Sequence, residues 1–200
     1  MDRREFIRLA VLSTIGVGLN TFAELLRPSK VKAFSILETA EPMIYKRFLD
    51  FTEYEERPET NCIVIHHTGF PDVDKDSKII DIHKLHQEVN GWAGVGYHYL
   101  IRKDGMIEQG RLPEAIGAHA YQHNKTSIGV CLAGNFDIGK PTKEQMASVK
   151  ELTAWLCRKY DIDSYKKGAI VGHRNLNDTS CPGEALYRKL DEIRDFCQYN

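Results

Sequence analysis

Two histidines and one cysteine, His66, His173 and Cys181, have the residue types and positions that a metal site requires. Each histidine ends a short apolar run, and Cys181 follows His173 by eight positions, directly before a Pro-Gly pair. Two strand ends and one loop could therefore bring two imidazoles and a thiolate to one point. Zinc prefers nitrogen and sulfur ligands in a tetrahedral shell, and a catalytic zinc leaves one of its four positions to water. The pattern therefore predicts a three-ligand catalytic Zn²⁺ site.

Hydrolysis at such a site would need further groups beside the metal. Zinc-bound water has a pKa of about 7, and the ion also polarises a carbonyl oxygen. A donor must still stabilise the tetrahedral oxyanion, and another group must handle the proton of the attacking water. The phenol of Tyr97 could be that donor, and Thr179 could present its hydroxyl from the loop that carries Cys181. Three more histidines are candidates near the cleft: His67, His98 and His119.

Each of these residues also has a purely structural interpretation. A histidine at the end of a strand is commonly a hydrogen-bonded structural residue, Cys181 alone could be half of a disulfide, and Tyr97 could pack within the sheet. Tyr97 and His98 are neighbours on an expected strand, so their side chains lie on opposite faces and at most one can face the metal. The metal hypothesis therefore depends on the joint pattern rather than on any one residue.

Composition limits the class of protein. The 200 residues, of which 42% are hydrophobic and 28% are charged, suit one globular domain with a sizeable core. The net charge of -1 gives the whole protein no attraction to nucleic acid or to acidic membranes, and no arginine-rich stretch in the body of the chain changes this. Composition therefore favours chemistry on sugars, peptides or small molecules.

Residues 1–33 resemble a twin-arginine export signal. Arg3 and Arg4 are followed by Phe6 and then by a short, moderately apolar stretch, and residues 31–33 form a tolerable small-x-small cleavage site. The apolar stretch is shorter than the roughly 20 residues that span a bilayer, so we expect no stable membrane span after signal removal. An ordinary amphipathic helix or a short uncleaved anchor is the alternative. The resemblance implies an exported protein of the periplasm or cell envelope.

The five cysteines are an awkward number for a disulfide framework. If Cys181 binds metal, four cysteines are left. Cys131 and Cys157 lie in apolar patterns, so we expect both to pack in the core as free thiols. Cys62 and Cys197 could pair in an oxidising compartment, which the sequence alone does not establish.

The expected elements alternate between strands and helices after residue 60. For residues 34–60 we expect an extension, with a short helix near residues 44–51 and then a linker. Five strands are expected in the body: 62–66, 97–102, 106–109, 126–132 and 169–173. Three helices are expected beside them: 78–89, a long helix that a Thr-x-x-Gln capping box opens at Thr142, and 183–196. This order predicts an α/β fold, with residues 61–200 as a single domain whose mixed central sheet is flanked by helices.

Short motifs occur along the body of the chain in a fixed order: His66-His67-Thr68, Gly91-Trp92, Val95 to Ile101, Asp104-Gly105, Gly110-Arg111, Gly117-Ala118-His119, Ser127 to Val130, Gly134-Asn135-Phe136, Gly172-His173 and Cys181-Pro182-Gly183. Over about residues 61–185, this ordered set resembles the zinc-dependent type 2 N-acetylmuramoyl-L-alanine amidases. That family shares its fold with the peptidoglycan recognition proteins and a phage lysozyme. The resemblance implies the same fold here.

The resemblance also implies an activity. It implies that His66, His173 and Cys181 are Zn²⁺ ligands and that Tyr97 assists cleavage of the amide between N-acetylmuramic acid and the first L-alanine of the stem peptide. Some members carry lysine at the position of Thr179, and the amidase-active recognition proteins resemble this chain in lacking it. Members that only bind peptidoglycan lack the ligand cysteine, so Cys181 favours an enzyme. Peptidoglycan or muropeptides would be the partners of a protein that we expect to be a monomer.

A stem peptide needs a groove beside the metal. We expect polar groove contacts from Arg111, His119 and Asn124, an aromatic contact from Trp92, and a further contact from His67; satisfied hairpin and loop structure is the alternative. Two rival functions also stay open. One is a module that binds peptidoglycan without cutting it, and the other is a metal peptidase acting on the stem, because a fold does not fix the bond that is cleaved.

Overall fold

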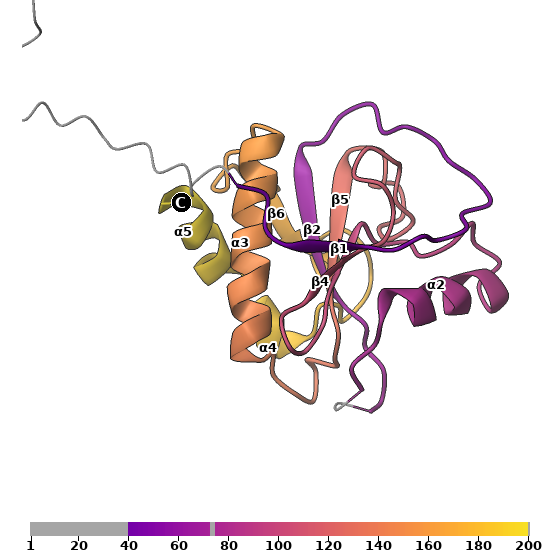
Figure 1. Ribbon diagram of the computed structural model, residues 1–200. Helices are drawn as coiled ribbons and strands as arrows, with labels where there is room; N and C mark the ends of the chain where they lie inside the picture. Colours follow the sequence, from indigo (N-terminus) through magenta and orange to yellow (C-terminus); the bar gives the residue numbers. More distant parts are fainter. Residues whose placement is uncertain (1–39, 73–74, 200) are drawn as a thin grey trace, which may run out of the picture. The chain divides into compact units, whose positions relative to one another are not determined.

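A six-stranded mixed sheet, with the strand order β1-β4-β3-β5-β2-β6, lies at the centre of the computed structural model, which describes residues 40–72 and 75–199 (Figure 1). The strands are β1 (Ile44–Lys46), β2 (Cys62–His67), β3 (Tyr99–Ile101), β4 (Ile107–Gln109), β5 (Ser127–Leu132) and β6 (Ile170–Gly172). The hairpin strands β3 and β4 are antiparallel, and the other pairings are parallel. The predicted mixed sheet is confirmed.

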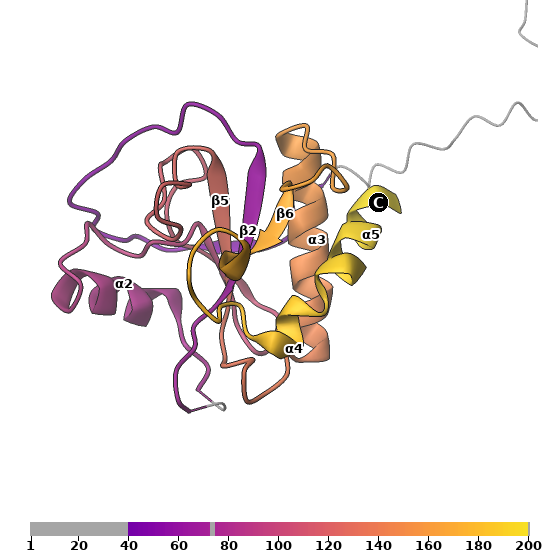
Figure 2. The same ribbon diagram turned by 180° about the vertical axis from the view of Figure 1, so that it is seen from behind.

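Helices cover both faces of this sheet. On one face, α3 (Lys143–Lys159) and α5 (Leu190–Tyr199) lie side by side, and the short α4 (Glu184–Tyr187) precedes α5 (Figure 2). On the other face lies α2 (Ile79–Glu88). The predicted capping box is present, because Gln145 N–H donates to Thr142 Oγ1 at 3.0 Å and Thr142 N–H donates to Gln145 Oε1 at 3.1 Å. The predicted α/β class with flanking helices is therefore confirmed.

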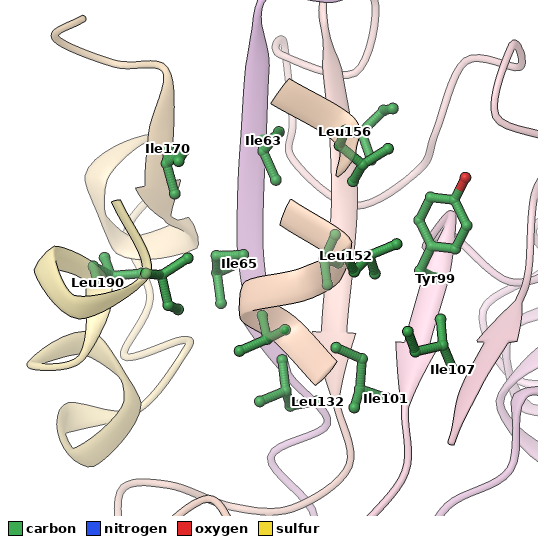
Figure 3. Packing of buried hydrophobic residues seen from close by; sticks show 14 of the residues in the cluster. Ile63, Ile65, Tyr99, Ile101, Ile107, Leu132, Leu152, Leu156, Ile170 and Leu190 are labelled. Atoms are coloured by element: carbon green, nitrogen blue, oxygen red, sulfur yellow. The ribbon is translucent and has the colours of Figure 1, made fainter. Parts of the chain in front are cut away.

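Two separate hydrophobic cores support the sheet. Ile63 and Ile65 belong to the larger core, in which they lie against the Leu152 and Leu156 side chains of α3 (Figure 3). The smaller core contains Ile79 of α2 with neighbouring β-strand residues. Full burial of one such aliphatic side chain stabilises the fold by about 1.5–3 kcal/mol. The larger core thus fixes β2 through Ile63 and Ile65, which suits a strand that must hold side chains at its end in defined positions.

The segment before β2 differs from its prediction. The short helix expected near residues 44–51 is wrong, because Ile44–Lys46 forms the edge strand β1 and pairs in parallel with β4. Three residues are too few to show a period, and the open edge of β4 offers backbone partners that a local pattern does not reveal. Part of the predicted extension therefore belongs to the sheet. The predicted signal, residues 1–33, lies outside the described residues.

The end of the chain also differs in detail. The single helix expected over 183–196 is two helices, α4 and α5, and the chain changes direction between them (Figure 2). Leu186 of α4 and both Leu190 and Ile193 of α5 enter the larger core, so the break lets α5 follow α3 while α4 stays near the loop before it. No helix among residues 40–72 and 75–199 is long and apolar enough to cross a membrane.

The cysteines are free thiols. Cys131 and Cys157 are buried as predicted. The hypothetical bridge between Cys62 and Cys197 is not formed, and Cys197 packs against the larger core instead. That contact results from the packing of α5 on α3, which the sequence does not reveal.

Candidate metal centre

The side chains of His66, His173 and Cys181 converge at one edge of the sheet. A nitrogen of each imidazole and the Cys181 sulfur all lie within 4.8 Å of one another. His66 Nδ1 is 3.6 Å from Cys181 Sγ. Zinc bonds of about 2.0 Å to nitrogen and 2.3 Å to sulfur, at a tetrahedral angle, separate the two ligand atoms by about 3.5 Å, close to this distance. The convergence expected from the sequence is thus present, and this donor set fits a zinc ion.

Strand register explains why the two histidines meet. Ile65 of β2 pairs with Gly172 of β6, and the two strands are parallel. The next residues along the chain, His66 and His173, therefore lie side by side at the carboxyl ends of these two strands. Because a parallel sheet brings the carboxyl ends of its strands together, this edge is the usual position of ligand sites in α/β folds.

A short loop places Cys181 opposite the histidines. Arg174 N–H donates to the Cys181 carbonyl oxygen at 2.8 Å, which closes the loop between them. A side chain at Gly172 would approach Pro182 Cδ to 2.8 Å, so glycine is required for Pro182 to pack there. The backbone N–H of His67 donates to Cys181 Sγ at 3.4 Å. A backbone donor of this kind stabilises a thiolate, which is the form that binds zinc.

A second layer of hydrogen bonds orients both imidazoles. His173 Nε2 lies 3.0 Å from Asn177 Oδ1, and Asn177 Nδ2 donates to the Tyr121 carbonyl oxygen at 3.2 Å. Because Asn177 Oδ1 can only accept, His173 Nε2 carries the hydrogen and Nδ1 is left as the ligand atom. His66 Nε2 lies 3.1 Å from His119 Nδ1, which leaves His66 Nδ1 for a metal. Metal-binding histidines commonly use their second nitrogen in this way.

Burial sets the protonation states of the centre. Burial lowers the pKa of His66 well below its ordinary value, and the neighbouring His119 and His173 lower it further. The pKa of His173 is also lowered by burial. Both imidazoles are therefore neutral at neutral pH, as metal ligands must be. Burial raises the pKa of Cys181 to about 12, so in the absence of a cation it is a thiol, whereas a bound zinc deprotonates a coordinating thiol.

A cleft of about 540 Å³ opens beside His173. Five residues singled out from the sequence line it: Trp92, Tyr97, His119, Asn124 and Thr179. The centroid of the Tyr97 ring lies 5.1 Å from that of the His66 ring. Burial raises the pKa of Tyr97 well above its ordinary value, so its phenol stays protonated and can donate. Thr179 Oγ1 accepts the Cys181 N–H at 3.2 Å and keeps its own hydrogen for another acceptor.

Two of the lining residues also shape the wall of the cleft. Asn124 Oδ1 accepts the backbone N–H groups of both His119 and Ala120 at 2.9 Å, which fixes the loop that carries the His119 ring. A side chain at Gly129 would approach His119 Cγ to 2.6 Å, so the ring packs directly on that glycine. Trp92 is partly exposed and its ring contacts His86 at 4.8 Å between centroids.

The structure does not bring His67, Arg111 or His98 to this cleft. His67 lies on the opposite face of β2 from His66, where its Nδ1 accepts the N–H of Phe136 at 3.1 Å. Arg111 donates to two backbone carbonyls and lines a neighbouring hollow beside Trp92. His98 is fully buried, with its Nδ1 accepting the N–H of Gly129 at 3.0 Å. The substrate contacts predicted for His67 and Arg111 are therefore not part of this cleft, because hydrogen bonds elsewhere hold their side chains.

Other cleft residues were missed by sequence reasoning. His86, Tyr121 and Asn177 all line the cleft. His86 follows the apolar face of α2, and its spacing predicts core packing equally well. Asn177 is an ordinary loop residue by sequence, and only its place four positions after His173 gives a signal.

Comparisons with known proteins identify relatives of this chain. Residues 56–184 match a family model described as N-acetylmuramoyl-L-alanine amidase. Peptidoglycan-recognition protein LB of Drosophila melanogaster is 35% identical over 143 residues, which cover 69% of this chain and 61% of that protein. An endolysin of Enterobacteria phage K11 is 33% identical over 141 residues, which cover 68% of this chain and 89% of the endolysin. The matched region thus spans less than two thirds of the Drosophila protein.

Solved structures of related proteins have a similar fold. The endolysin N-acetylmuramoyl-L-alanine amidase LysCS from Clostridium intestinale superposes with a TM-score of 0.70 at 31% identity, covering 78% of this chain and 98% of that one. A tyrosine-to-phenylalanine mutant of Drosophila PGRP-LB in complex with tracheal cytotoxin gives a TM-score of 0.65 at 32% identity, covering 74% of this chain and 92% of that one.

Proposed function

Because the chain belongs to the N-acetylmuramoyl-L-alanine amidase family, we propose that it is a zinc-dependent enzyme of that activity. Its substrate would be the amide between N-acetylmuramic acid and the first L-alanine of a peptidoglycan stem peptide. The observation that carries this proposal is the convergence of His66, His173 and Cys181 beside a cleft lined by Tyr97 and Thr179. Family members named as endolysins and amidases support the hydrolytic reaction.

The proposed ligands would hold a zinc ion that supplies a water of pKa about 7 and a Lewis acid for the carbonyl oxygen. The protein groups around it would do the remaining work. Tyr97, protonated at neutral pH, would donate to the carbonyl oxygen as negative charge develops there. Thr179 would hold the attacking water or the amide nitrogen through its free hydroxyl hydrogen. His119 and Asn177 would keep the two imidazoles in the orientation that presents Nδ1.

The cleft is the proposed binding place for the substrate. Trp92 offers an aromatic surface, and His119 and Tyr121 line the same hollow next to His173. A solved relative, PGRP-LB, is described in complex with tracheal cytotoxin, which supports a peptidoglycan-type ligand for this cleft. Peptidoglycan lies outside the inner membrane, so the twin-arginine-like signal agrees with the proposed substrate, and we propose a site of action in the periplasm or cell envelope.

The test is hydrolysis of a purified muramyl-peptide by the full chain, zinc-loaded and chelator-stripped, with products identified by mass. We expect zinc-dependent release of the intact stem peptide, which Cys181→Ser abolishes and which re-added zinc does not restore. A shortened stem peptide would instead identify a peptidase. Binding of the muramyl-peptide without any cleavage, in a preparation shown to contain zinc, would leave a recognition module.

A further inference from the structure

The segment of residues 44–52 contacts the helix that forms one wall of the cleft. It lies before residues 56–184, the part of the chain that matches the amidase family model. Its strand β1 pairs with β4, and Arg47 Nε donates to Glu108 Oε1 at 2.9 Å. The second oxygen of the fully buried Glu108 accepts the Ile79 N–H at 2.8 Å, at the start of α2. Segment 44–52 therefore helps to fix the start of α2.

Two buried histidines of α2 hold the backbone that leads to Tyr97. His83 and His86 are three positions apart, so they lie on the same face of the helix. His83 Nδ1 accepts the Val95 N–H at 3.2 Å, and His86 Nδ1 accepts the Gly96 N–H at 3.0 Å. The next residue is Tyr97, whose phenol lines the cleft. The two imidazoles thus set the position of the chain directly before the proposed donor.

Asp50 of segment 44–52 determines how His83 is used. His83 Nε2 lies 3.0 Å from Asp50 Oδ1. Because a carboxylate only accepts, Nε2 carries the hydrogen, and Nδ1 is left to accept the Val95 N–H. Gln87 Nε2 donates to the Asp50 carbonyl oxygen at 2.8 Å, which keeps Asp50 against α2. The Asp50 side chain is 80% exposed and that of His83 is fully buried. A surface carboxylate therefore orients a buried ring.

Close packing leaves the His83 ring little freedom. The edge of the Phe51 ring meets it at 4.8 Å between centroids. A side chain at Gly94 would approach His83 Cε1 to 2.5 Å, so the backbone passes directly against the imidazole. A side chain at Gly96 would collide with the backbone of the loop on the other side. Because the chain is confined on both sides, a displacement of the His83 ring would also displace Tyr97.

We propose that Asp50 and His83 are positioning residues for the Tyr97 phenol. Neither residue lines the cleft, so both would act through the hydrogen bond to the Val95 N–H. The inference rests on the proposed function, in which Tyr97 donates to the carbonyl oxygen of the scissile amide. A catalytic group must be placed to within a fraction of an ångström, so loss of this support should lower kcat rather than raise KM.

The first test is hydrolysis of a muramyl-peptide by full-length, zinc-loaded Asp50→Ala. We expect kcat to fall by roughly tenfold, with KM and zinc content unchanged. The exposed Asp50 side chain leaves no cavity when it is removed. Asp50→Asn keeps an acceptor oxygen and should recover most of the loss. Glu55→Ala, which removes another exposed carboxylate close by in the chain, should match the natural protein. An unchanged kcat in Asp50→Ala would overturn the proposal.

A double-mutant cycle separates positioning of the phenol from general support of the fold. In Tyr97→Phe the group to be positioned is absent, so Asp50→Ala should cause no further fall in the residual kcat. A tenfold fall in both backgrounds would mean that Asp50 supports the fold without acting through Tyr97, and the proposal would be wrong.

NMR of the same proteins tests the geometry without any assay of hydrolysis. Nitrogen-15 signals should place the His83 hydrogen on Nε2 in the natural protein. Amide hydrogen exchange at Val95 should become about tenfold faster in Asp50→Ala. The Gly129 N–H, which a different buried histidine accepts through Nδ1, is the internal reference and should not change. A hydrogen on Nδ1, or unchanged exchange at Val95, would contradict the role of Asp50. Absence of cleavage by the natural protein would instead contradict the proposed function.

Discussion

The two faces of the sheet use two adjacent histidines for different purposes. On one face His66 points to the cleft, where its nitrogens meet Cys181 and His119. On the other face His67 accepts a backbone N–H from Phe136 and packs against that ring. Residue type, burial and position in the chain are nearly the same for both. What differs is the partner that each face supplies, so the fold, rather than the imidazole, determines which histidine can bind a metal.

Separate replacement of the two histidines gives the largest expected contrast. In His66→Ala a ligand is lost, and we expect no stoichiometric zinc and a fall in hydrolysis of at least about a thousandfold, since several kcal/mol of transition-state stabilisation are removed. His67→Ala should keep one zinc per chain. Its free energy of unfolding should fall by about 1–3 kcal/mol, because the buried N–H of Phe136 loses its acceptor.

Zinc content by elemental analysis and urea unfolding would check both variants. A folded His67→Ala protein without zinc would contradict the assignment of the two faces. Retention of zinc and activity in His66→Ala would contradict the proposed centre itself.

The cleft face should also depend on donors that do not bind the metal. Tyr97→Phe removes a phenol that the structure keeps protonated, while the ring beside His66 is preserved. We expect kcat to fall by roughly 100-fold to 1000-fold, as for the loss of one oxyanion donor, with zinc content unchanged. Thr179→Val tests the neighbouring hydroxyl in the same assay. A Tyr97→Phe enzyme of unchanged kcat would remove the phenol from the mechanism.

Replacement of a residue that orients a metal ligand should have a smaller effect than replacement of the ligand itself. Asn177→Ala removes the acceptor of the His173 Nε2 hydrogen, so the affinity for zinc should fall by about 10-fold to 100-fold. Asn177→Asp keeps an acceptor oxygen at that position and is the matched control. Competition with a chromophoric chelator measures the affinity without any assay of hydrolysis. Equal affinities in the Ala variant and the natural protein would show that Asn177 does not orient His173.

Much of the difference between His66 and His67 could be predicted from the sequence. The part that could not be predicted depends on packing between segments far apart in the chain. The apolar runs before His66 and His173 predict buried parallel strands, whose carboxyl ends must share one edge. Alternation places His66 and His67 on opposite faces, but the sequence does not state which face carries the cleft. The pairing of Ile65 with Gly172 decides this, and a register between strands more than 100 residues apart leaves no local signal.

Long-range packing also explains other differences between the predicted and the observed structure. Ile44 joins the sheet because β4 has a free edge, not because its neighbours form a strand pattern. The place of Cys197 is set by the packing of α5 on the larger core, which is why the sequence alone left its pairing with Cys62 open. The Thr142 capping box, in contrast, is entirely local, and it was predicted correctly.

The buried histidines should also make the stability of the protein depend on pH. Burial lowers the pKa of His86 to about 4, and its Nδ1 accepts the N–H of Gly96 at 3.0 Å. Above about pH 6.5 the residue is neutral in both folded and unfolded chains, so it contributes nothing to the pH dependence of the stability. Between about 6.5 and 4 the unfolded chain binds the extra proton, so stability is lost as the pH falls, by up to about 1.4 kcal/mol per pH unit for this group.

Urea unfolding of the metal-free protein from pH 7 to pH 4.5 measures this dependence. His86→Gln keeps an acceptor for the Gly96 N–H but does not titrate, so its stability should fall less steeply with pH than that of the natural protein. His98, whose pKa burial lowers to about 3, should give a further loss that both proteins share. Identical slopes in the two proteins would mean that His86 is solvated enough to titrate normally. In that case the cleft wall at Trp92 would be more open than the ring contact between His86 and Trp92 indicates.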